Sequence, residues 1–119
     1  MPRVTARRMV IIVQMISARL IDETVQKIVT ALHPRRVMVF GSHARGDAGP
    51  DSDLDLFVEM DSELSPPERA VRVARLFPRR DWPLDVVVYT PAEVLRLRGI
   101  GGTLLDAIER EGRVVYDAH

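Results

Sequence analysis

Two aspartates, Asp53 and Asp55, stand at the head of the segment 53–60 with one residue between them. The apolar residues that alternate along this segment are Leu54, Leu56, Val58 and Met60. Such alternation predicts a β-strand on which both carboxylates share one face, roughly 6.6 Å apart. Aspartate is uncommon in strands, and like charges this close repel. The pair is therefore interpreted either as two solvated surface carboxylates or as a site for a hard cation such as Mg²⁺.

A second group with possible chemistry lies just upstream, where Gly41 and Ser42 follow an apolar run at 37–40 that predicts a buried strand. The Gly, Pro, Ser and Asp residues of positions 41–52 predict a turn and loop. Glycine lets a backbone approach a ligand closely, and turn N–H groups with a hydroxyl bind anions. Arg45 could add a charged contact to phosphate. The turn and the carboxylate pair together predict a site for a metal-bound polyphosphate, in which His43 is interpreted as exposed rather than as a general base.

The wording GSHARGDAGPDSDLDLFV, with Gly41-Ser42, ten intervening residues and Asp53-Leu54-Asp55, resembles the DNA polymerase β-like nucleotidyltransferase superfamily. Within it, this stretch is similar to the minimal nucleotidyltransferase (MNT) antitoxins encoded beside HEPN-domain toxins. The resemblance covers residues 17–117, nearly the whole chain. It implies a third acidic residue on a neighbouring strand. Asp85, at the head of the strand predicted at 84–90, is the candidate, and a surface aspartate near a turn is the alternative.

The resemblance also implies a reaction and a partner. Asp53, Asp55 and Asp85 would hold two Mg²⁺ ions, and Gly41 and Ser42, with Arg45, would contact the phosphates of ATP. AMP would pass to a hydroxyl, in the family a tyrosine, of a partner HEPN ribonuclease toxin that forms a hetero-oligomer with the chain and is silenced. Two alternatives stay open: a non-catalytic antitoxin that neutralises by binding, and a nucleotidyltransferase for a small molecule such as an aminoglycoside.

The other elements follow from periodicity and capping signals. Apolar residues at helical spacing predict a helix from Ile16 to Leu32, ended by Pro34. Ser65 and Thr90, each followed by Pro and then by Glu three residues on, predict capped helix starts. The helix that starts at Ser65 is predicted to turn Val71 inward, and a last helix at 103–111 is predicted to turn Leu104 inward. A closing strand or extended tail at 114–116 completes the chain. These elements predict an α/β (α+β) domain, a small mixed sheet flanked by helices in the polymerase β-like fold.

Length and composition limit the remaining possibilities. A chain of 119 residues predicts a single domain at 16–119, with residues 1–15 an uncertain N-terminal extension whose apolar run Met9–Val13 needs a partner surface. Seventeen basic residues balance seventeen acidic ones, so no direct nucleic-acid binding is expected, and the Arg residues at 69–80 are interpreted as a solvated face. The absence of cysteine excludes disulfides and zinc–thiolate sites. No apolar stretch is long enough to cross a membrane, and a cytoplasmic location is expected.

Overall fold

A four-stranded mixed sheet forms the centre of the computed structural model, which describes residues 16–118. The strands are β1 (Arg36–Phe40), β2 (Leu54–Glu59), β3 (Leu84–Tyr89) and β4 (Arg113–Asp117), in the spatial order β3-β2-β1-β4. β1 pairs antiparallel with β2 and with β4, whereas β2 and β3 run parallel. The predicted fold class is confirmed, and the closing segment is a strand rather than a tail.

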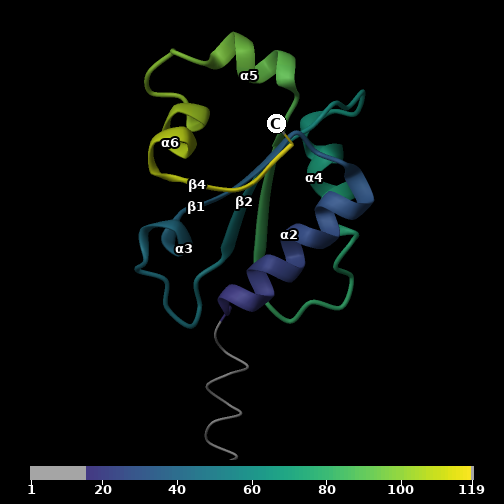
Figure 1. Cartoon of the computed structure of the whole chain (residues 1–119), viewed down its shortest axis with the longest axis vertical. Helices are drawn as coiled ribbons and strands as arrows, with labels where there is room; N and C mark the ends of the chain where they lie inside the picture. The colour runs from purple at the N-terminus through teal and green to yellow at the C-terminus, as the bar shows by residue number, and fades with distance from the viewer. Residues whose placement is uncertain (1–15, 119) are drawn as a thin grey trace, which may run out of the picture.

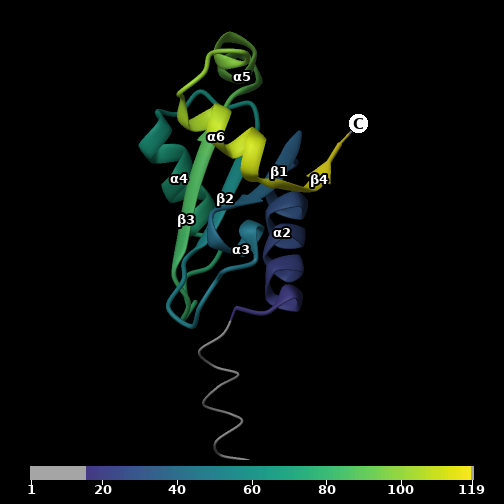
Figure 2. The same ribbon diagram turned by 90° about the vertical axis from the view of Figure 1, so that its left-hand side faces the viewer.

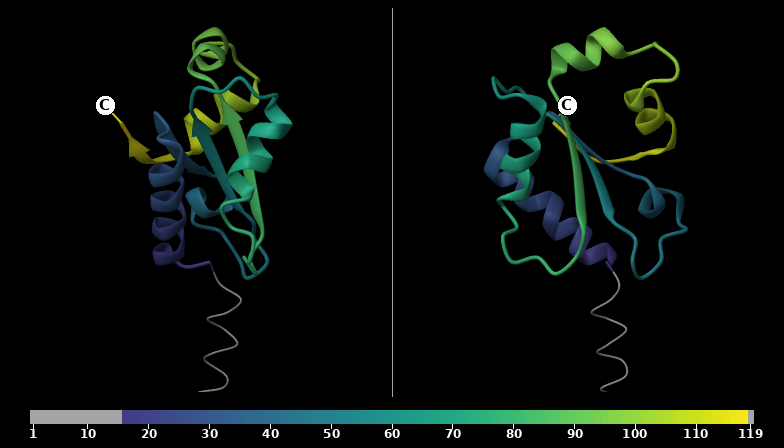
Figure 3. Two further views of the ribbon diagram at one scale, coloured as in Figure 1. Left: turned by 90° about the vertical axis from the view of Figure 1, so that its right-hand side faces the viewer. Right: turned by 180° about the vertical axis from the view of Figure 1, so that it is seen from behind.

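Helices cover both faces of this sheet (Figure 1). On one face, α2 (Ala18–Leu32) and α4 (Pro66–Ala74) bury Ile28 and Val73 against Leu56 of β2. On the other face, α5 (Pro91–Leu97) and α6 (Leu104–Glu111) pack against Phe57 of β2. Figure 1 and the right-hand view of Figure 3 show the sheet edge-on between these two layers, with the one-turn helix α3 (Ser42–Arg45) below α6. Figure 2 looks onto the face that α6 covers. The strand residues therefore alternate between two apolar clusters, which leaves little of β2 in contact with solvent.

Capping side chains fix where the helices begin. Ser17 accepts a hydrogen bond from the N–H of Leu20 at the start of α2. Ser65 and Thr90 each form the predicted capping box, in which the hydroxyl accepts from the N–H of Glu68 or Glu93 and the glutamate accepts from the cap N–H. These local signals could be read from the sequence because their partners lie only three residues away.

Three side-chain orientations differ from expectation. Val71 and Leu104, predicted to face inward, are 48% and 50% exposed, whereas Arg69, predicted on a solvated face, is 7% exposed. The inward face of α4 consists of Arg69 and Val73, four residues apart, so Val71 points away from the sheet. The prediction for residues 1–15, including Met9–Val13, lies outside the described residues. No helix within 16–118 combines the length and apolar character that a membrane span requires.

Candidate functional site

Strand register brings Asp55 and Asp85 side by side. Asp55 of β2 is the register partner of Asp85 in β3 and, on its other side, of Phe40 in β1. Neighbouring strands lie about 4.8 Å apart, and residues in register share a face. Phe57 and Val87, two residues further along the same strands, pack in the α5–α6 cluster. Both carboxylates therefore occupy the sheet face that α6 covers further along, at the end where β2 and β3 begin.

The turn after β1 lies directly against one of these carboxylates. Gly41 has a φ of 70° and a ψ of −152°, and a Cβ added to it would overlap the Oδ2 atom of Asp55. Its carbonyl accepts hydrogen bonds from the N–H groups of Ala44 and Arg45, both at 3.1 Å, which closes the single turn of α3. The segment 41–52 was predicted as turn and loop, and this short helix was not foreseen. Glycine is required here because any side chain would displace Asp55.

The electrostatics tie all three predicted carboxylates together. The pKa of Asp55 is raised, first by burial and then by the charges of Asp85 and Asp53, while His43 and Arg45 act in the opposite direction. Asp55 is half-buried, whereas Asp53, the residue before β2, and Asp85 are exposed. The three carboxylates thus repel one another across one small area of the sheet. A bound cation would relieve this repulsion and favour the ionised forms.

The donor set fits a magnesium site of the kind that a substrate completes. Within the part of the chain that the structure describes, no group of three or more acidic, His or Cys side chains is already arranged to hold a metal ion. Mg²⁺ is usually held by one or two carboxylates together with waters and substrate phosphates, so a complete protein cage is not needed. Asp55 and Asp85 supply two carboxylates in register, and Asp53 stands one residue before β2. All the available ligands are oxygen atoms, as Mg²⁺ prefers.

The predicted phosphate-contacting residues lie in and around α3. Ser42 is its first residue and is half-buried. Arg45 is exposed, and its Nε lies 3.3 Å from Oδ2 of the exposed Asp47, a solvated ion pair that constrains it weakly. The interpretation of His43 as an exposed turn residue is wrong: its ring is half-buried, and its buried Nε2 has no hydrogen-bond partner in residues 16–118. The turn that carries His43 lies against Asp55 of β2 through Gly41.

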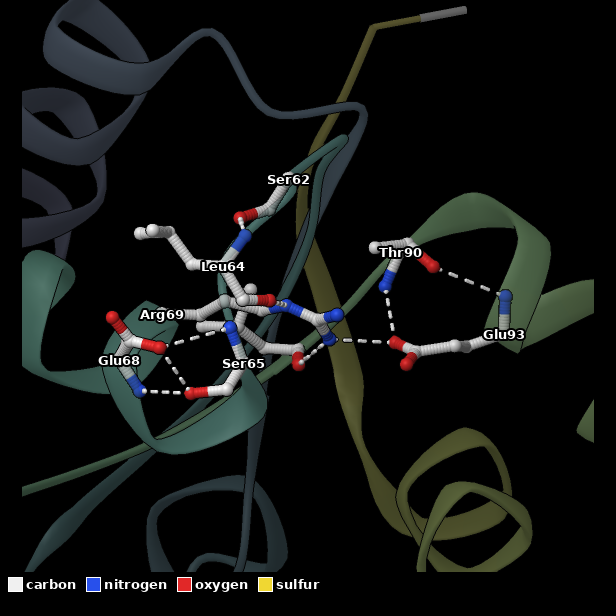
Figure 4. Close-up of polar contacts among 8 residues, drawn as sticks. Ser62, Leu64, Ser65, Glu68, Arg69, Thr90 and Glu93 are labelled. Carbon is white, nitrogen blue, oxygen red and sulfur yellow. Dashed lines mark hydrogen bonds and ion pairs between the residues drawn. The ribbon is translucent and has the colours of Figure 1, made fainter.

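An ion-pair network at the other end of β3, away from the carboxylates, was missed (Figure 4). The Nε of Arg69 donates to the carbonyl of Leu64 at 2.8 Å, and its Nη1 donates to Oε1 of Glu93 at 2.7 Å and to the carbonyl of Val88 at 3.4 Å. The same Glu93 oxygen accepts from the N–H of Thr90 at 2.8 Å. One buried guanidinium thus joins α4, the end of β3 and the start of α5. The available signal was the four-residue spacing from Arg69 to Val73, which places Arg69 on the apolar face of α4.

Comparison with known proteins gives the same fold. A protein assigned as a nucleotidyltransferase in Sulfolobus solfataricus superposes with a TM-score of 0.58 at 21% identity, covering 84% of this chain and 79% of that one. A toxin–antitoxin crystallised with AMP-PNP superposes with a TM-score of 0.53 at 19% identity, covering 82% of this chain and 74% of that one. None of the curated proteins compared with the chain matches it. The model of the nucleotidyltransferase domain family matches residues 20–100, a range that includes Gly41, Ser42 and all three aspartates. The chain therefore belongs to the nucleotidyltransferase domain family.

Proposed function

We propose that this nucleotidyltransferase moves AMP from ATP to a hydroxyl, in particular a tyrosine hydroxyl, on a partner HEPN ribonuclease toxin and so acts as its antitoxin. The observation that carries the proposal is the pairing of Asp55 with Asp85 in register, against the glycine turn at Gly41. Family membership supports the reaction class. The fold shared with a toxin–antitoxin crystallised with AMP-PNP supports the choice of an adenine nucleotide and of a toxin partner. The MNT-like wording of residues 41–58 supports the HEPN type.

Each site residue has a role in this proposal. Asp53, Asp55 and Asp85 would hold two Mg²⁺ ions. When bound, Mg²⁺ supplies neutralisation of the triphosphate and alignment of the attacking and leaving oxygens. Gly41 and Ser42 would contact the β- and γ-phosphates through backbone N–H groups and the serine hydroxyl, because the turn lies against Asp55.

The transfer balances without any further reactant. The acceptor oxygen forms a bond to the α-phosphorus, and the bond from that phosphorus to the bridging oxygen breaks. Pyrophosphate leaves with the electron pair of that bond, and the hydroxyl proton passes to Asp85 or to solvent. Asp85 suits this role because it is exposed and lies on the outermost strand on its side of the sheet. Arg45, held only by a solvated ion pair, can turn towards the phosphates.

We assign this activity to one domain over residues 16–119, working in the cytoplasm where ATP is available, with residues 1–15 as an N-terminal extension. The described residues 16–118 form one sheet with its covering helices and contain no second sheet. A protein acceptor fits this architecture because the partner would supply the surface that surrounds its own hydroxyl. A small-molecule acceptor would need a substrate pocket built by a further element.

Labelled ATP tests the proposal directly. The chain, Mg²⁺, ATP labelled at the α-phosphate and the purified HEPN toxin should give a labelled toxin, and Asp53→Asn should abolish the label. A toxin without Mg²⁺-dependent label, or one labelled equally by Asp53→Asn, would contradict the proposal. If Asp55→Asn still protected cells from the toxin, neutralisation by binding would replace it. Labelling of an aminoglycoside by the chain alone would favour the small-molecule alternative.

A further inference from the structure

One edge of the sheet is unpaired beside the candidate site. β3 is the last strand on its side, and no strand of residues 16–118 pairs with its outer edge. Figure 2 shows β3 as the leftmost strand, with α4 next to the end at which β3 finishes. Leu84, Val86 and Val87 are half-buried and Asp85 is exposed, whereas Val88 is 3% exposed. The open part of the edge is therefore the part next to Asp85.

The hydrogen bonds to β2 show which backbone groups point outward. The carbonyl of Pro83 accepts a hydrogen bond from the N–H of Leu54 at 2.9 Å, and the carbonyl of Tyr89 accepts one from the N–H of Met60 at 3.0 Å. Backbone groups alternate in direction along a strand, so the N–H and C=O groups of Leu84 and Val86 point away from β2. These groups are the template that an additional strand would use.

The open part of the β3 edge ends near Val88, and the opposite edge of the sheet at β4 is less regular. At the end of β3, Nη1 of Arg69 donates a hydrogen bond to the outward carbonyl of Val88 at 3.4 Å, so this carbonyl already has a partner (Figure 4). The other outer strand, β4, pairs with β1 through a register shift between Val37 and Met38. Irregularities of this kind twist an edge and discourage further pairing. The regular edge at 84–87 is thus the better template of the two.

We propose that the protein acceptor docks as an added β-strand on the outer edge of β3 at residues 84–87, with a hydroxyl-bearing side chain opposite Asp85. The inference rests on the proposed function. An extended backbone is the partner that satisfies the outward groups of Leu84 and Val86 together. In such a strand, the residue beside Asp85 on the same face lies about 5 Å from it. Docking on the edge thus places the acceptor oxygen at the carboxylates and in reach of a nucleotide bound there.

The substitution Val86→Pro removes one outward donor and leaves the ladder to β2 intact, because proline is tolerated where a strand N–H faces solvent. Val86→Ala is the matched control, since it also trims the side chain but keeps the N–H. Toxin labelling by Val86→Pro should show a KM for the toxin raised about tenfold or more. The KM for ATP and the affinity for AMP-PNP should stay those of Val86→Ala. An unchanged KM for the toxin would overturn the inference.

Hydrogen exchange on the unmodified chain gives a second readout that does not depend on the variant folding. The amides of Leu84 and Val86 should exchange rapidly in the free chain and about tenfold or more slowly when AMP-PNP and the toxin are bound. The amide of buried Phe57 is the internal control. Exchange at Leu84 and Val86 that the toxin leaves unchanged would overturn docking on the edge. The inference would also be overturned if this chain formed a dimer, Val86→Pro dissociated that dimer, and the KM for the toxin stayed unchanged. The edge would then pair with a second copy of this chain.

The two proposals fail in different ways. If the unmodified chain labels no toxin, the proposed function is wrong. If it labels the toxin and Val86→Pro does so with the same KM, the function stands and the docking edge is wrong.

Discussion

Replacing Gly41 by alanine should damage the site more than the fold. The backbone of Gly41, at φ 70° and ψ −152°, lies near a region that only glycine uses readily, and another residue there costs about 1–3 kcal/mol. The added Cβ would also overlap the Asp55 carboxylate. That carboxylate is the end of a short side chain, so it would rotate away rather than break the sheet. We expect the free energy of unfolding to fall by about 2 kcal/mol.

The functional loss should be larger, because the displaced Asp55 carboxylate is one of the proposed cation ligands. Affinity for AMP-PNP with Mg²⁺ should weaken at least about tenfold, since even residues that merely support metal ligands have effects of that size. Urea unfolding followed by circular dichroism gives the stability, and titration calorimetry gives the affinity.

Gly49→Ala is the matched control. Gly49 lies in the same loop segment, has no positive φ, and would have nothing within 4 Å of an added Cβ. Its substitution should change the unfolding free energy by no more than about 0.5 kcal/mol and leave nucleotide affinity unchanged. If Gly41→Ala and Gly49→Ala behave alike in both assays, contact between the turn and Asp55 has no role in the site.

Three further predictions concern charge. Asp55→Asn should raise the free energy of unfolding at neutral pH. Because the pKa of Asp55 is raised, the folded chain holds this proton more tightly than the unfolded chain, so stability falls as pH rises from about 3.8 through the pKa of the folded chain. Urea unfolding across that pH interval should show this fall in the unmodified chain and not in the variant. Arg69→Met should lower the unfolding free energy by about 3 kcal/mol, because Glu93 and the carbonyls of Leu64 and Val88 lose a buried hydrogen-bond donor. Arg72 is exposed on the same helix, so Arg72→Met should change the unfolding free energy by at most about 0.5 kcal/mol in the same assay. Burial raises the pKa of Glu93, but hydrogen bonds from Thr90 and Arg69 outweigh it and lower the pKa. The stability that ionised Glu93 contributes is therefore present above pH 4.5 and is lost as pH falls through the pKa of Glu93 in the folded chain. Glu93→Gln should remove this loss of stability in acid, as measured by urea unfolding.

The sequence predicted what depends on short-range signals. Alternation at residues 53–60 and the apolar run at 37–40 predicted the strands that the structure pairs as β1 and β2, and Ser65 and Thr90 predicted the helix starts. The placement of Asp85 beside Asp55 could not come from spacing, because a parallel pairing depends on the crossover through α4. The family resemblance suggested it, and the register brings the two residues together.

What the sequence did not predict depends on tertiary packing. In the sequence, Arg69 does not differ from the exposed arginines around it. Only the packing of α4 against the sheet brings its guanidinium within hydrogen-bond distance of the carbonyl of Val88 and the carboxylate of Glu93 in α5. The same holds for His43, which is half-buried in the turn that lies against Asp55 of β2. The helical turn at α3 was missed because glycine, serine and aspartate at 41–52 favour loops in general. Only the space available beside Asp55 shows why Gly41 in particular is needed.

Titration of AMP-PNP, with and without Mg²⁺, tests the central claim most directly: acidic side chains from two adjacent strands hold a nucleotide-bound cation. The unmodified chain should bind only with Mg²⁺, and Asp53→Asn, Asp55→Asn and Asp85→Asn should each weaken binding about tenfold or more. Asp61→Asn, an exposed carboxylate just beyond the opposite end of β2, should leave binding unchanged. Binding that ignores Mg²⁺, or that survives Asp55→Asn and Asp85→Asn at full affinity, would contradict the account.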